Sequence, residues 1–492
     1  MGQTGGFILS LPLLFSSIST FYSLVCYNSL MILKITKFDD LIWKKEFEPI
    51  NFVKKSPPRD FDQQISDMDD TLVFSGGVGI AAPQAGISKQ IFIVSLPNYH
   101  EVFINPKITK YSKETDEMEE GCLSIPGYRG MVPRSTEVVI EYQTLDGEKK
   151  TLTANGFLAR VLQHETDHLN HTFYPSRIKL EKDFYQIVPI KIVFFGSPEF
   201  SAIILQNLIG QGTAGDYQVQ LVVTQPDKPG NRNALTSSAA KQIAEKFDIP
   251  VITPNSLRVK AKGEQGEEIR IADPKIVKQI KKLKPDVIVV ASYGKILPQE
   301  ILDTAKKGAL NVHGSMLPKY RGASPIQAAL AAGDTDTGVT IMKMNDKMDE
   351  GDILASAKIK ISDADTFETL SKKMAEIGAS LLNQIIHYVV WRPKAIKAVP
   401  QDHTQATYTK LLTKEDGYFD LKKPPKNLAQ LVRAYHPWPG VWTHLESRSK
   451  NLELREKKVI KLLPNKMVQM EGKSPVTLKQ FQSGHPEFKL DW

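Results

Sequence analysis

Two histidines on a predicted helix are the first residues whose types and spacing could do chemistry. His164 and His168 stand four apart in QHETDH (163–168), so both imidazoles project from one helix face, as two ligands of one metal ion do. Glu165 can act as a general base on a bound water without being a ligand. A catalytic site also needs a third protein ligand and an open position, and Cys122 in EEGCLSIPG is the candidate. HExxH strings also occur on ordinary helices, so this motif alone leaves both interpretations open.

A second set of reactive residue types lies far downstream, in ALNVHGSMLPKYRGASPIQAAL (309–330). Asn311 and His313 are two apart in a short apolar strand, so their side chains share one face at its carboxyl end. Asp349 follows in MNDKMDEGDIL (344–354). This set suits acyl transfer to an amine, in which Asn311 and His313 polarise the carbonyl and Asp349 assists proton movement. The spacing alone also fits a structural histidine at a strand end.

Short strands and one helix must position the first set. Alternating apolar residues predict strands over 90–96, 101–106 and 136–154. The last of these is a hairpin with Asp146 and Gly147 in its turn. Asn155 and Gly156 then offer the cap of the histidine-bearing helix, whose apolar residues recur at helical spacing. Residues 31–183 are therefore predicted to form an α+β domain with one functional helix.

The pattern changes near residue 188. Apolar runs that end in loops recur in IVPIKIVFFGSPEF, VQLVVTQ, PDVIVVASYG and ALNVHGS, with helical segments between them. Buried parallel strands that alternate with helices predict a Rossmann-like open α/β sheet over 188–395, with its site at the carboxyl ends of the strands. The second reactive set belongs to this edge. Residues 400–492 form a small, basic, mixed third unit.

Length and composition indicate a folded protein of two or three domains. A chain of 492 residues exceeds one ordinary core, and 41% hydrophobic with 24% charged residues is typical of folded proteins. The net charge of +8 favours an anionic partner such as nucleic acid, although a soluble lysine-rich surface gives the same value. Two cysteines exclude a disulfide framework and fit a reducing compartment, which predicts a cytoplasmic location.

The first thirty residues follow a different pattern. Residues 7–26 are uncharged, and no Lys or Arg precedes Lys34, so both the basic start of a signal peptide and the charged flank of a membrane span are missing. Gly6 stands where a myristoylation motif has Ser or Thr. Met31 opens a segment that resembles the start of a folded domain. Residues 1–30 are predicted to be a dispensable extension, with a hydrophobic anchor and a membrane contact as the alternative.

Two further segments complete a pattern with QHETDH. SGGVGIAAPQAG (75–86) and EGCLSIPG (120–127) precede it in that order. Together the three motifs resemble peptide deformylase, whose pattern is GxGxAAPQ, EGCLS and HExDH, over roughly 31–180. The resemblance implies removal of the formyl group from N-terminal formyl-methionine of nascent peptides, with the ribosome as the place where these are met. A general peptidase is the alternative that the cysteine ligand disfavours.

The family's residue roles carry over to the matching positions. The resemblance implies Fe²⁺, with Zn²⁺ or Ni²⁺ as substitutes, since one thiolate and two imidazoles accommodate all three. Its implied ligands are Cys122, His164 and His168. Glu165 would take a proton as water attacks the formyl carbon. The side-chain amide of Gln84 and the backbone N–H of Leu123 would donate to the oxyanion, and Gly79 would leave room for the substrate backbone.

The second half resembles methionyl-tRNA formyltransferase over roughly 188–492. The matching runs are KIVFFGSPEF, VVTQPDKP, VHGSMLPKYRGASPIQAALAAGDTDTGVTIMKM and MDEGD. The Asn-x-His pair with a downstream Asp belongs to all folate-dependent formyltransferases and implies 10-formyltetrahydrofolate as formyl donor. The SxLPxxRGxxPIQ block is more specific, although UDP-sugar formyltransferases carry a similar one. It implies four substrate-binding residues, of which the last shapes the loop beside the site: Ser315, Leu317, Pro318 and Arg321.

The third unit indicates which molecule accepts the formyl group. YHPWPGVWT (435–443) resembles the start of that family's OB-like C-terminal barrel, and the SRSKNLELREKK run is basic enough to contact phosphates. This implies the initiator Met-tRNA, and not DNA, as the nucleic-acid partner. The family's tRNA-probing loop runs roughly PAGRGKKL, whereas this chain has PGNRNAL (229–235), in which Arg232 matches and both lysines are absent.

The sequence therefore predicts a bifunctional enzyme of bacterial-type translation in three domains. An α+β metallohydrolase domain comes first, an α/β formyltransferase domain second, and a small β-rich, OB-like domain last. One activity formylates the initiator Met-tRNA and the other later removes the formyl group. Two alternatives for the second half stay open: a formyltransferase acting on an amino-sugar nucleotide, and a folate- or RNA-binding module without turnover.

Overall fold

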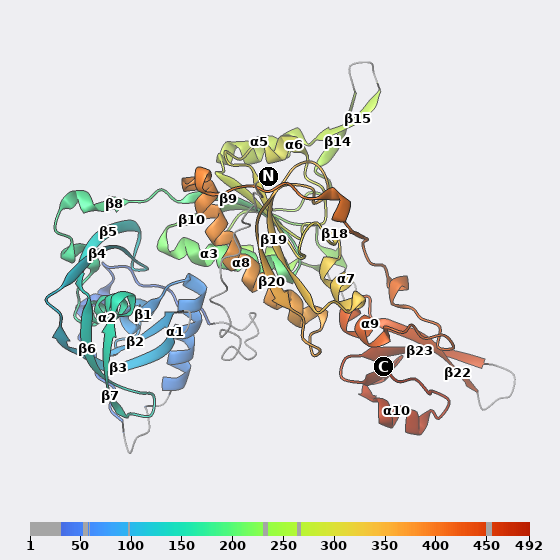
Figure 1. Cartoon of the computed structure of the whole chain (residues 1–492), viewed down its shortest axis with the longest axis horizontal. Helices are drawn as coiled ribbons and strands as arrows, with labels where there is room; N and C mark the ends of the chain where they lie inside the picture. The colour runs from blue at the N-terminus through green and yellow to red at the C-terminus, as the bar shows by residue number, and fades with distance from the viewer. Residues whose placement is uncertain are drawn as a thin grey trace, which may run out of the picture. The chain divides into compact units, whose positions relative to one another are not determined.

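The computed structural model describes residues 31–52, 58, 60–96, 99–229, 235–262, 267–448 and 455–492. The chain divides into two compact units, Met1–Ile190 with Gln206–Val219 and Lys191–Leu205 with Gln220–Trp492 (Figure 1). The predicted extension 1–30 and Arg232 lie outside the described residues. Within the described ranges, none of the helices combines the length and the apolar character that a membrane crossing requires.

The first unit is built on antiparallel sheets. One sheet has the strand order β1-β2-β3-β6-β7 and another has the order β4-β5-β8. The bounds are β1 Gly79–Ala81, β2 Ile91–Leu96, β3 Tyr99–Tyr111, β4 Thr115–Cys122, β5 Ile125–Ser135, β6 Glu137–Gln143, β7 Lys149–Asn155 and β8 Phe184–Gln186. The predicted hairpin is confirmed as the antiparallel pair β6-β7, and Gly147 in its connection has φ 75, a left-handed conformation that favours glycine.

The helix α2 crosses the first unit with the two histidines. It begins directly after β7, and its N-cap is Asn155, as predicted, although the side chain of Asn155 makes no capping hydrogen bond. Val161 and Leu162 lie in one buried cluster with Phe92 and Phe103 of the larger sheet. The helical elements of this unit are η3 Leu41–Lys44, α1 Phe61–Ser75, η4 Ala82–Ala85, α2 Gly156–Leu169, η5 Tyr174–Arg177 and η6 Glu181–Asp183. Packing against the sheet thus fixes the face of α2 that carries the histidines.

A mixed sheet forms the centre of the second unit, in the order β13-β10-β9-β16-β17-β19-β20. The bounds are β9 Ile190–Gly196, β10 Tyr217–Val223, β13 Val251–Ile252, β16 Val287–Ala291, β17 Ala309–His313, β19 Asp336–Lys343 and β20 Ile353–Lys360. The predicted open α/β sheet is confirmed, with parallel pairing at β10-β13, β9-β16 and β16-β17. Its last two strands are antiparallel, which the strand-and-helix pattern did not indicate.

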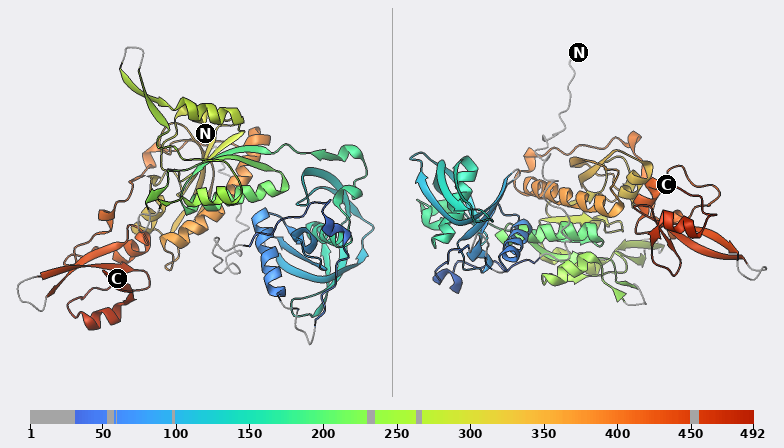
Figure 2. Two further views of the ribbon diagram at one scale, coloured as in Figure 1. Left: turned by 180° about the vertical axis from the view of Figure 1, so that it is seen from behind. Right: turned by 90° about the horizontal axis from the view of Figure 1, so that it is seen from below.

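Helices cover both faces of this sheet (Figure 2). Ile276 of α5 belongs to one buried cluster with Val193 and Ile288 of the central strands. Gly378 of α8 lies against Val312 of β17. Val312 points to the opposite face of the sheet from Ile288, because Ile288 pairs with Ala309 and successive residues of a strand alternate between the two faces. The helices are α3 Glu199–Gln211, α4 Ala239–Lys246, α5 Pro274–Leu283, α6 Gln299–Leu302, α7 Pro325–Ala332 and α8 Phe367–Trp391, and the short turn η7 Gly212–Ala214 after α3 belongs to the first unit.

Short strand pairs and turns complete the framework around this sheet. The paired strands are β11 Lys228–Pro229 with β12 Leu235–Thr236, β14 Arg258–Lys262 with β15 Glu268–Ala272, and β18 Arg321–Gly322 with β21 Tyr408–Thr409. The short turns after α8 are η9 Pro393–Ala395, η10 His403–Gln405 and η11 Lys414–Gly417. Because β18 and β21 are 87 residues apart at Arg321 and Tyr408, their parallel pairing ties the loop after β17 to the segment that follows α8.

The C-terminal part of the second unit has its own β-rich core, as predicted. An antiparallel sheet in the order β22-β23-β24-β25 packs with two helices. The bounds are α9 Leu428–Tyr435, β22 Val441–Arg448, β23 Arg455–Leu463, β24 Met467–Met470, β25 Val476–Thr477 and α10 Leu478–Gly484. Leu445, Ile460 and Leu462 of the sheet share a buried cluster with Phe481 of α10, so this part carries a core separate from that of the large sheet.

Candidate active sites

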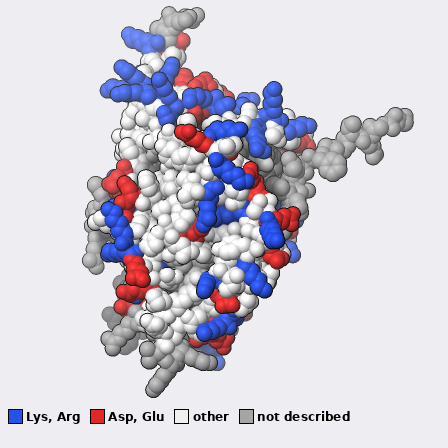
Figure 3. Space-filling view, turned by 90° about the vertical axis from the view of Figure 1, so that its left-hand side faces the viewer, with Lys and Arg blue, Asp and Glu red and all other residues white. Residues whose placement is uncertain are grey.

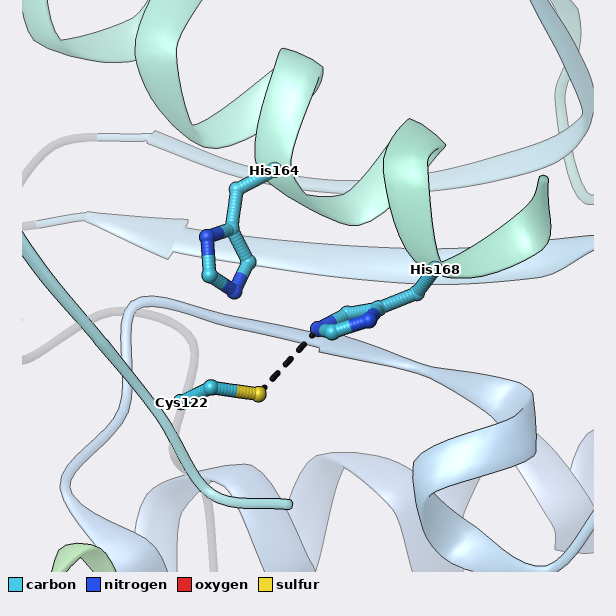
Figure 4. Close-up of side chains that lie close together, drawn as sticks. All are labelled: Cys122, His164 and His168. Atoms are coloured by element: carbon cyan, nitrogen blue, oxygen red, sulfur yellow. Dashed lines mark hydrogen bonds between the residues drawn. The ribbon is translucent and has the colours of Figure 1, made fainter. Parts of the chain in front are cut away.

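The three predicted metal ligands come together between α2 and the end of β4. The ligand atoms of Cys122, His164 and His168 all lie within 4.8 Å of one another, and Figure 4 shows the three side chains converging. Cys122 Sγ is 3.3 Å from His168 Nε2. The histidines are one helical turn apart on α2, with ring centroids separated by 4.8 Å. The structure therefore brings a thiol and two imidazoles to one point, as the sequence predicts.

The chemistry of this donor set fits a divalent transition-metal ion. One thiolate and two imidazoles are the ligand types that Fe²⁺, Ni²⁺ and Zn²⁺ accept, and three protein ligands leave a position open for water. Glu120 Oε2 lies 2.9 Å from His164 Nδ1, so the carboxylate orients the ring and directs Nε2 toward the other two ligands. Cys122 and His168 are buried, so little solvent competes with an ion for them.

A buried ion network holds Glu120 in place. Arg134 donates to Glu120 through Nε and Nη2, at 2.9 Å each, and to Asp167 through Nη1 at 2.5 Å. Arg160 Nη1 donates to Glu120 Oε1 at 2.8 Å. Burial alone would raise the pKa of Glu120, but the hydrogen bonds from Arg134 and His164 hold this pKa well below its usual range. Glu120 is therefore ionised and can orient His164 at neutral pH.

Removal of Arg134 is expected to destabilise the helix that carries the histidines. Arg134→Met removes two hydrogen bonds from buried Glu120 and one from buried Asp167, which keep only Arg160 with His164 and Arg177 as partners. Loss of one partner of a buried ion pair typically costs about 3–5 kcal/mol. Hydrogen exchange of the amides in α2 should accelerate by roughly 100-fold or more. Lys179→Ala is the matched control, because the Lys179–Glu117 pair is more than half exposed on both sides and contributes little. Unchanged exchange in Arg134→Met would contradict a bracing role for the network.

Glu165 lies beside the ligands but turns toward Gly79. A Cβ atom on Gly79 would lie 2.4 Å from Glu165 Oε1, so the glycine leaves space for this carboxyl group. Within the described residues, Glu165 Oε2 is buried and makes no hydrogen bond. Burial raises the pKa of Glu165 to about 7. An unpartnered carboxyl oxygen in such a place suits proton transfer. The substrate contact expected at Gly79 stays a prediction, and the space there first serves Glu165.

The predicted oxyanion donors lie on the other side of Cys122. Gln84 Oε1 accepts from Ala81 N at 2.8 Å, which turns the amide nitrogen toward Cys122 Sγ at 3.4 Å. Leu123 follows Cys122 directly, so its backbone N–H lies next to the same ligand. Sequence analysis did not single out Glu120, although this acidic residue stands in the quoted EEGCLSIPG run. No spacing signal in the sequence identifies it, because its contact with His164 joins two segments 44 residues apart.

The second predicted set also meets, at the end of β17. Asn311 Nδ2 donates to Asp349 Oδ1 at 3.2 Å, and His313 Nδ1 is 3.6 Å from Asp349 Oδ2. His313 Nε2 is 2.9 Å from the carbonyl oxygen of Tyr320. Because a carbonyl oxygen only accepts, Nε2 carries a proton and Nδ1 faces the carboxylate. The imidazole therefore faces the carboxylate of Asp349 at a distance slightly longer than a hydrogen bond.

The predicted substrate-binding residues after β17 mainly shape their own loop. Ser315 Oγ donates to the carbonyl of Lys319 at 2.6 Å, and Leu317 N donates to Thr340 Oγ1 at 3.2 Å. Ser315 and Arg321 are fully buried and Leu317 nearly so, whereas Pro318 is partly exposed. Their substrate contacts stay predictions, since the contacts seen for Ser315, Leu317 and Arg321 are internal.

Comparisons with known proteins agree with both geometries. Residues 32–184 match the polypeptide deformylase family, residues 190–386 match formyl transferase, and residues 411–475 match the formyl transferase C-terminal domain. Methionyl-tRNA formyltransferase of Caldicellulosiruptor saccharolyticus is 41% identical over 272 residues, which cover 55% of this chain and 80% of that protein. This chain belongs to the methionyl-tRNA formyltransferase family. The enzyme of that name from Roseiflexus sp. is 40% identical over 257 residues, which cover 52% of this chain and 73% of that protein.

Solved peptide deformylases are similar to part of this chain. The Met-Ala-Ser-bound class I type b enzyme from Acinetobacter baumannii is 37% identical and covers 30% of this chain and 99% of its own, with a TM-score of 0.29. The enzyme from Thermotoga maritima is 36% identical, with the same two coverages and a TM-score of 0.29.

The methionyl-tRNA formyltransferase match and the deformylase match together confirm the predicted bifunctional translation enzyme. They do not favour the amino-sugar enzyme or the inactive binding module as alternatives for the second half. The deformylase match implies a metal, and the Cys–His–His cluster offers a site for it. The formyl transferase match implies a formyl-tetrahydrofolate donor.

On one face of this formyltransferase family member, Lys and Arg side chains gather in one region (Figure 3). Figure 3 shows Lys and Arg gathering toward the top, where the β14-β15 hairpin projects, whereas both signs are interspersed below. The exposed lysines of this hairpin and of α5 are Lys260, Lys262, Lys275, Lys278, Lys281 and Lys282. The side chains over 446–457, which include most of the predicted basic run, lie outside the described residues. The tRNA contacts of that run and of Arg232 stay predictions.

Proposed function

We propose that the second unit transfers a formyl group from 10-formyltetrahydrofolate to the initiator Met-tRNA, and that the first unit hydrolyses the formyl group of N-terminal formyl-methionine in nascent peptides. The observation that carries the proposal is the convergence of two reactive sets within their matched domains. The two reactions do not cancel, because the transfer reaction adds the formyl group to an aminoacyl-tRNA, whereas the hydrolysis reaction removes it from a peptide. This supports action at two separate stages of translation.

In the first unit, Cys122, His164 and His168 are the proposed metal ligands, and Fe²⁺ is the proposed ion, with Zn²⁺ or Ni²⁺ as substitutes. When bound, the ion would supply Lewis acidity and lower the pKa of a water ligand. Glu165 accepts the proton of the attacking water and passes it to the leaving amine. Hydrolysis of the N-formyl group thus gives formate and a peptide with a free N-terminus. Its buried, unpartnered Oε2 supports this assignment.

Two donors stabilise the oxyanion in this proposal. The Gln84 amide is held through its oxygen by Ala81 N–H, so its nitrogen can donate toward the cluster. The backbone N–H of Leu123 is the second donor. Removal of one such donor typically costs about 3 kcal/mol of transition-state stabilisation. Gly79 leaves room for Glu165, and in the proposal it also lets the substrate backbone approach.

In the second unit, Asn311 polarises the formyl carbonyl by a hydrogen bond, and Asp349 handles the proton of the attacking amine. Because both ring nitrogens of His313 already face Tyr320 and Asp349, His313 polarises the same carbonyl through the positive charge of its protonated form. An amide nitrogen has two protons, so Asn311 can donate one to Asp349 Oδ1 and the other to the formyl oxygen. Asp349 accepts the amine proton and shares it with His313 Nδ1, which lies 3.6 Å away. The amine nitrogen of the acceptor thus forms a bond to the formyl carbon, while the bond between this carbon and the folate nitrogen breaks. The proton passes to the folate nitrogen.

The remaining proposals concern location and contacts. The domain bounds 31–183, 188–395 and 400–492 are proposed for the deformylase, formyltransferase and OB-like parts. Arg232 and the C-terminal part would contact tRNA, with the substrate loop built from Ser315, Leu317, Pro318 and Arg321. A cytoplasmic location and an encounter with nascent peptides at the ribosome follow from the two proposed substrates.

The proposal is tested by separating the two activities in the full chain. Cys122→Ala should lose bound metal and formate release from a formyl-methionyl peptide, because it removes a ligand. It should still transfer formyl from 10-formyltetrahydrofolate to initiator Met-tRNA, because the second reactive set is intact. Elemental analysis of the wild-type chain identifies the ion, and iron at one atom per chain is the expected result. Deformylation that persists without metal, or transfer that requires a nucleotide sugar, would overturn the respective half.

A further inference from the structure

Asp349 is held in a backbone conformation that non-glycine residues seldom adopt. Its φ is 53, in the left-handed region, and it lies in the loop between β19 and β20. Such a conformation persists only where surrounding contacts determine it. Gly351 is equally constrained, because a Cβ atom there would lie 1.8 Å from the carbonyl oxygen of Lys343. The contacts that fix this loop therefore bear directly on the placement of the Asp349 carboxylate.

Gln401 supplies two of these contacts from far along the chain. Its Nε2 donates to the carbonyl oxygen of Asp349 at 2.9 Å and to that of Gly351 at 2.7 Å. Gln401 is 6% exposed, so both protons of its amide are engaged away from solvent. These two hydrogen bonds bracket Glu350 and tie the loop to the segment ahead of η10. Gln401 thus acts on the main chain of Asp349 and not on its carboxylate.

Arg321 determines which way the Gln401 amide points. Its Nε and Nη2 donate to Gln401 Oε1 at 3.1 and 2.7 Å. A guanidinium group has no acceptor, so it can bind only the oxygen end of an amide, and the nitrogen must face the loop. Arg321 is 0% exposed, and its Nη1 lies 3.2 Å from the hydroxyl of Tyr408 and 3.7 Å from Glu350 Oε1. Both Nη atoms also lie 3.2 Å from His403 Nδ1, so each nitrogen of the guanidinium group has a neighbouring polar atom.

The residue after Arg321 reaches the carboxylate itself. Gly322 N donates to Asp349 Oδ2 at 2.9 Å, while Asn311 donates to Oδ1. One short strand, β18, thus holds Asp349 twice: through Gln401 at its main chain and through Gly322 at its side chain. Together these contacts direct Oδ2 toward His313 Nδ1.

We propose that Gln401 and Arg321 are positioning residues for formyl transfer, which hold the Asp349 carboxylate at the imidazole of His313. This inference rests on the proposed role of Asp349. Neither residue needs to touch donor or acceptor, and the burial of both side chains fits that requirement. Their effect is on the rate of transfer from the bound complex and not on the binding of substrate.

Gln401→Glu in the full chain is the decisive variant. A carboxylate keeps the pairing with Arg321 but cannot donate to the carbonyl oxygens of Asp349 and Gly351, so the loop is released. The expected result is a kcat for formyl transfer that is roughly 10- to 100-fold lower, with the KM for 10-formyltetrahydrofolate nearly unchanged. The melting temperature should fall, because the carbonyl oxygens of Asp349 and Gly351 lose their donor. Gln401→Asn, which keeps the amide but shortens its reach, should give a smaller loss in the same direction.

Gln242→Glu is the matched control, because exposed Gln242 also donates to a backbone carbonyl, that of Ser237 at 3.1 Å, and lies outside this network. Deformylation by the same chains reports that the first unit is intact. A wild-type kcat in both Gln401 variants would overturn the inference, as would a loss that appears only in KM. Asp349→Asn is measured in parallel: if it transfers normally, the proposed function of Asp349 fails, whereas its inactivity beside a fully active Gln401→Glu sinks this inference alone.

Discussion

Replacement of Glu165 by Gln is expected to lower kcat for deformylation by about 10²- to 10⁴-fold while the chain keeps its metal. The amide has nearly the shape of the carboxyl group and fits the space that Gly79 leaves, but it cannot accept the proton of the attacking water. The ligand atoms of Cys122, His164 and His168 are unchanged, so the ion should stay bound. Formate release from a formyl-methionyl peptide measures the rate, and elemental analysis measures the metal.

The matched control for this prediction is Glu181→Gln. Glu181 is exposed in η6, in the same unit, so loss of its charge should leave both the rate and the metal content as they were. If Glu165→Gln retains more than a tenth of the wild-type rate with its metal in place, another group accepts the proton. If the metal is lost instead, the carboxyl group helps to hold the ion.

The metal centre was predictable because most of its geometry is local. A helix places residues four apart on one face, so His164 and His168 required only that α2 form. Cys122 is distant in sequence, and its assignment came from the order of three motifs and not from spacing. The network of Glu120, Arg134 and Asp167 had no such signal, because it joins three separate segments through side chains alone.

The second unit shows the same division between local and distant information. Strand alternation predicted that Asn311 and His313 share a face at the end of β17, and both contact or approach Asp349. The antiparallel pairing of β19 and β20 was not predicted, because the direction of a strand at the edge of a sheet depends on how the chain returns to the sheet and not on the residues of the strand. Gln401 was also missed, because its amide acts on the backbone of a loop 52 residues earlier, at Asp349.

Asp349→Asn should lower kcat for formyl transfer by roughly 10²- to 10⁴-fold, since the variant retains a side chain of the same shape but loses the proton acceptor. The amide can still accept from Gly322 N–H, so the loop should keep its course. It carries no charge, however, and cannot stabilise a protonated His313. The proton of the attacking amine then has no carboxylate to receive it at this position.

The measurement uses a Cys122→Ala background so that deformylation cannot interfere. Asp346→Asn is the control, because Asp346 is exposed in the same loop and removes an equal charge without touching β17. A loss confined to Asp349→Asn separates proton acceptance from the general electrostatics of the loop. Equal rates in the two variants would instead place the proton acceptor elsewhere, and Asn311 and His313 would then act on the formyl carbonyl without a carboxylate partner.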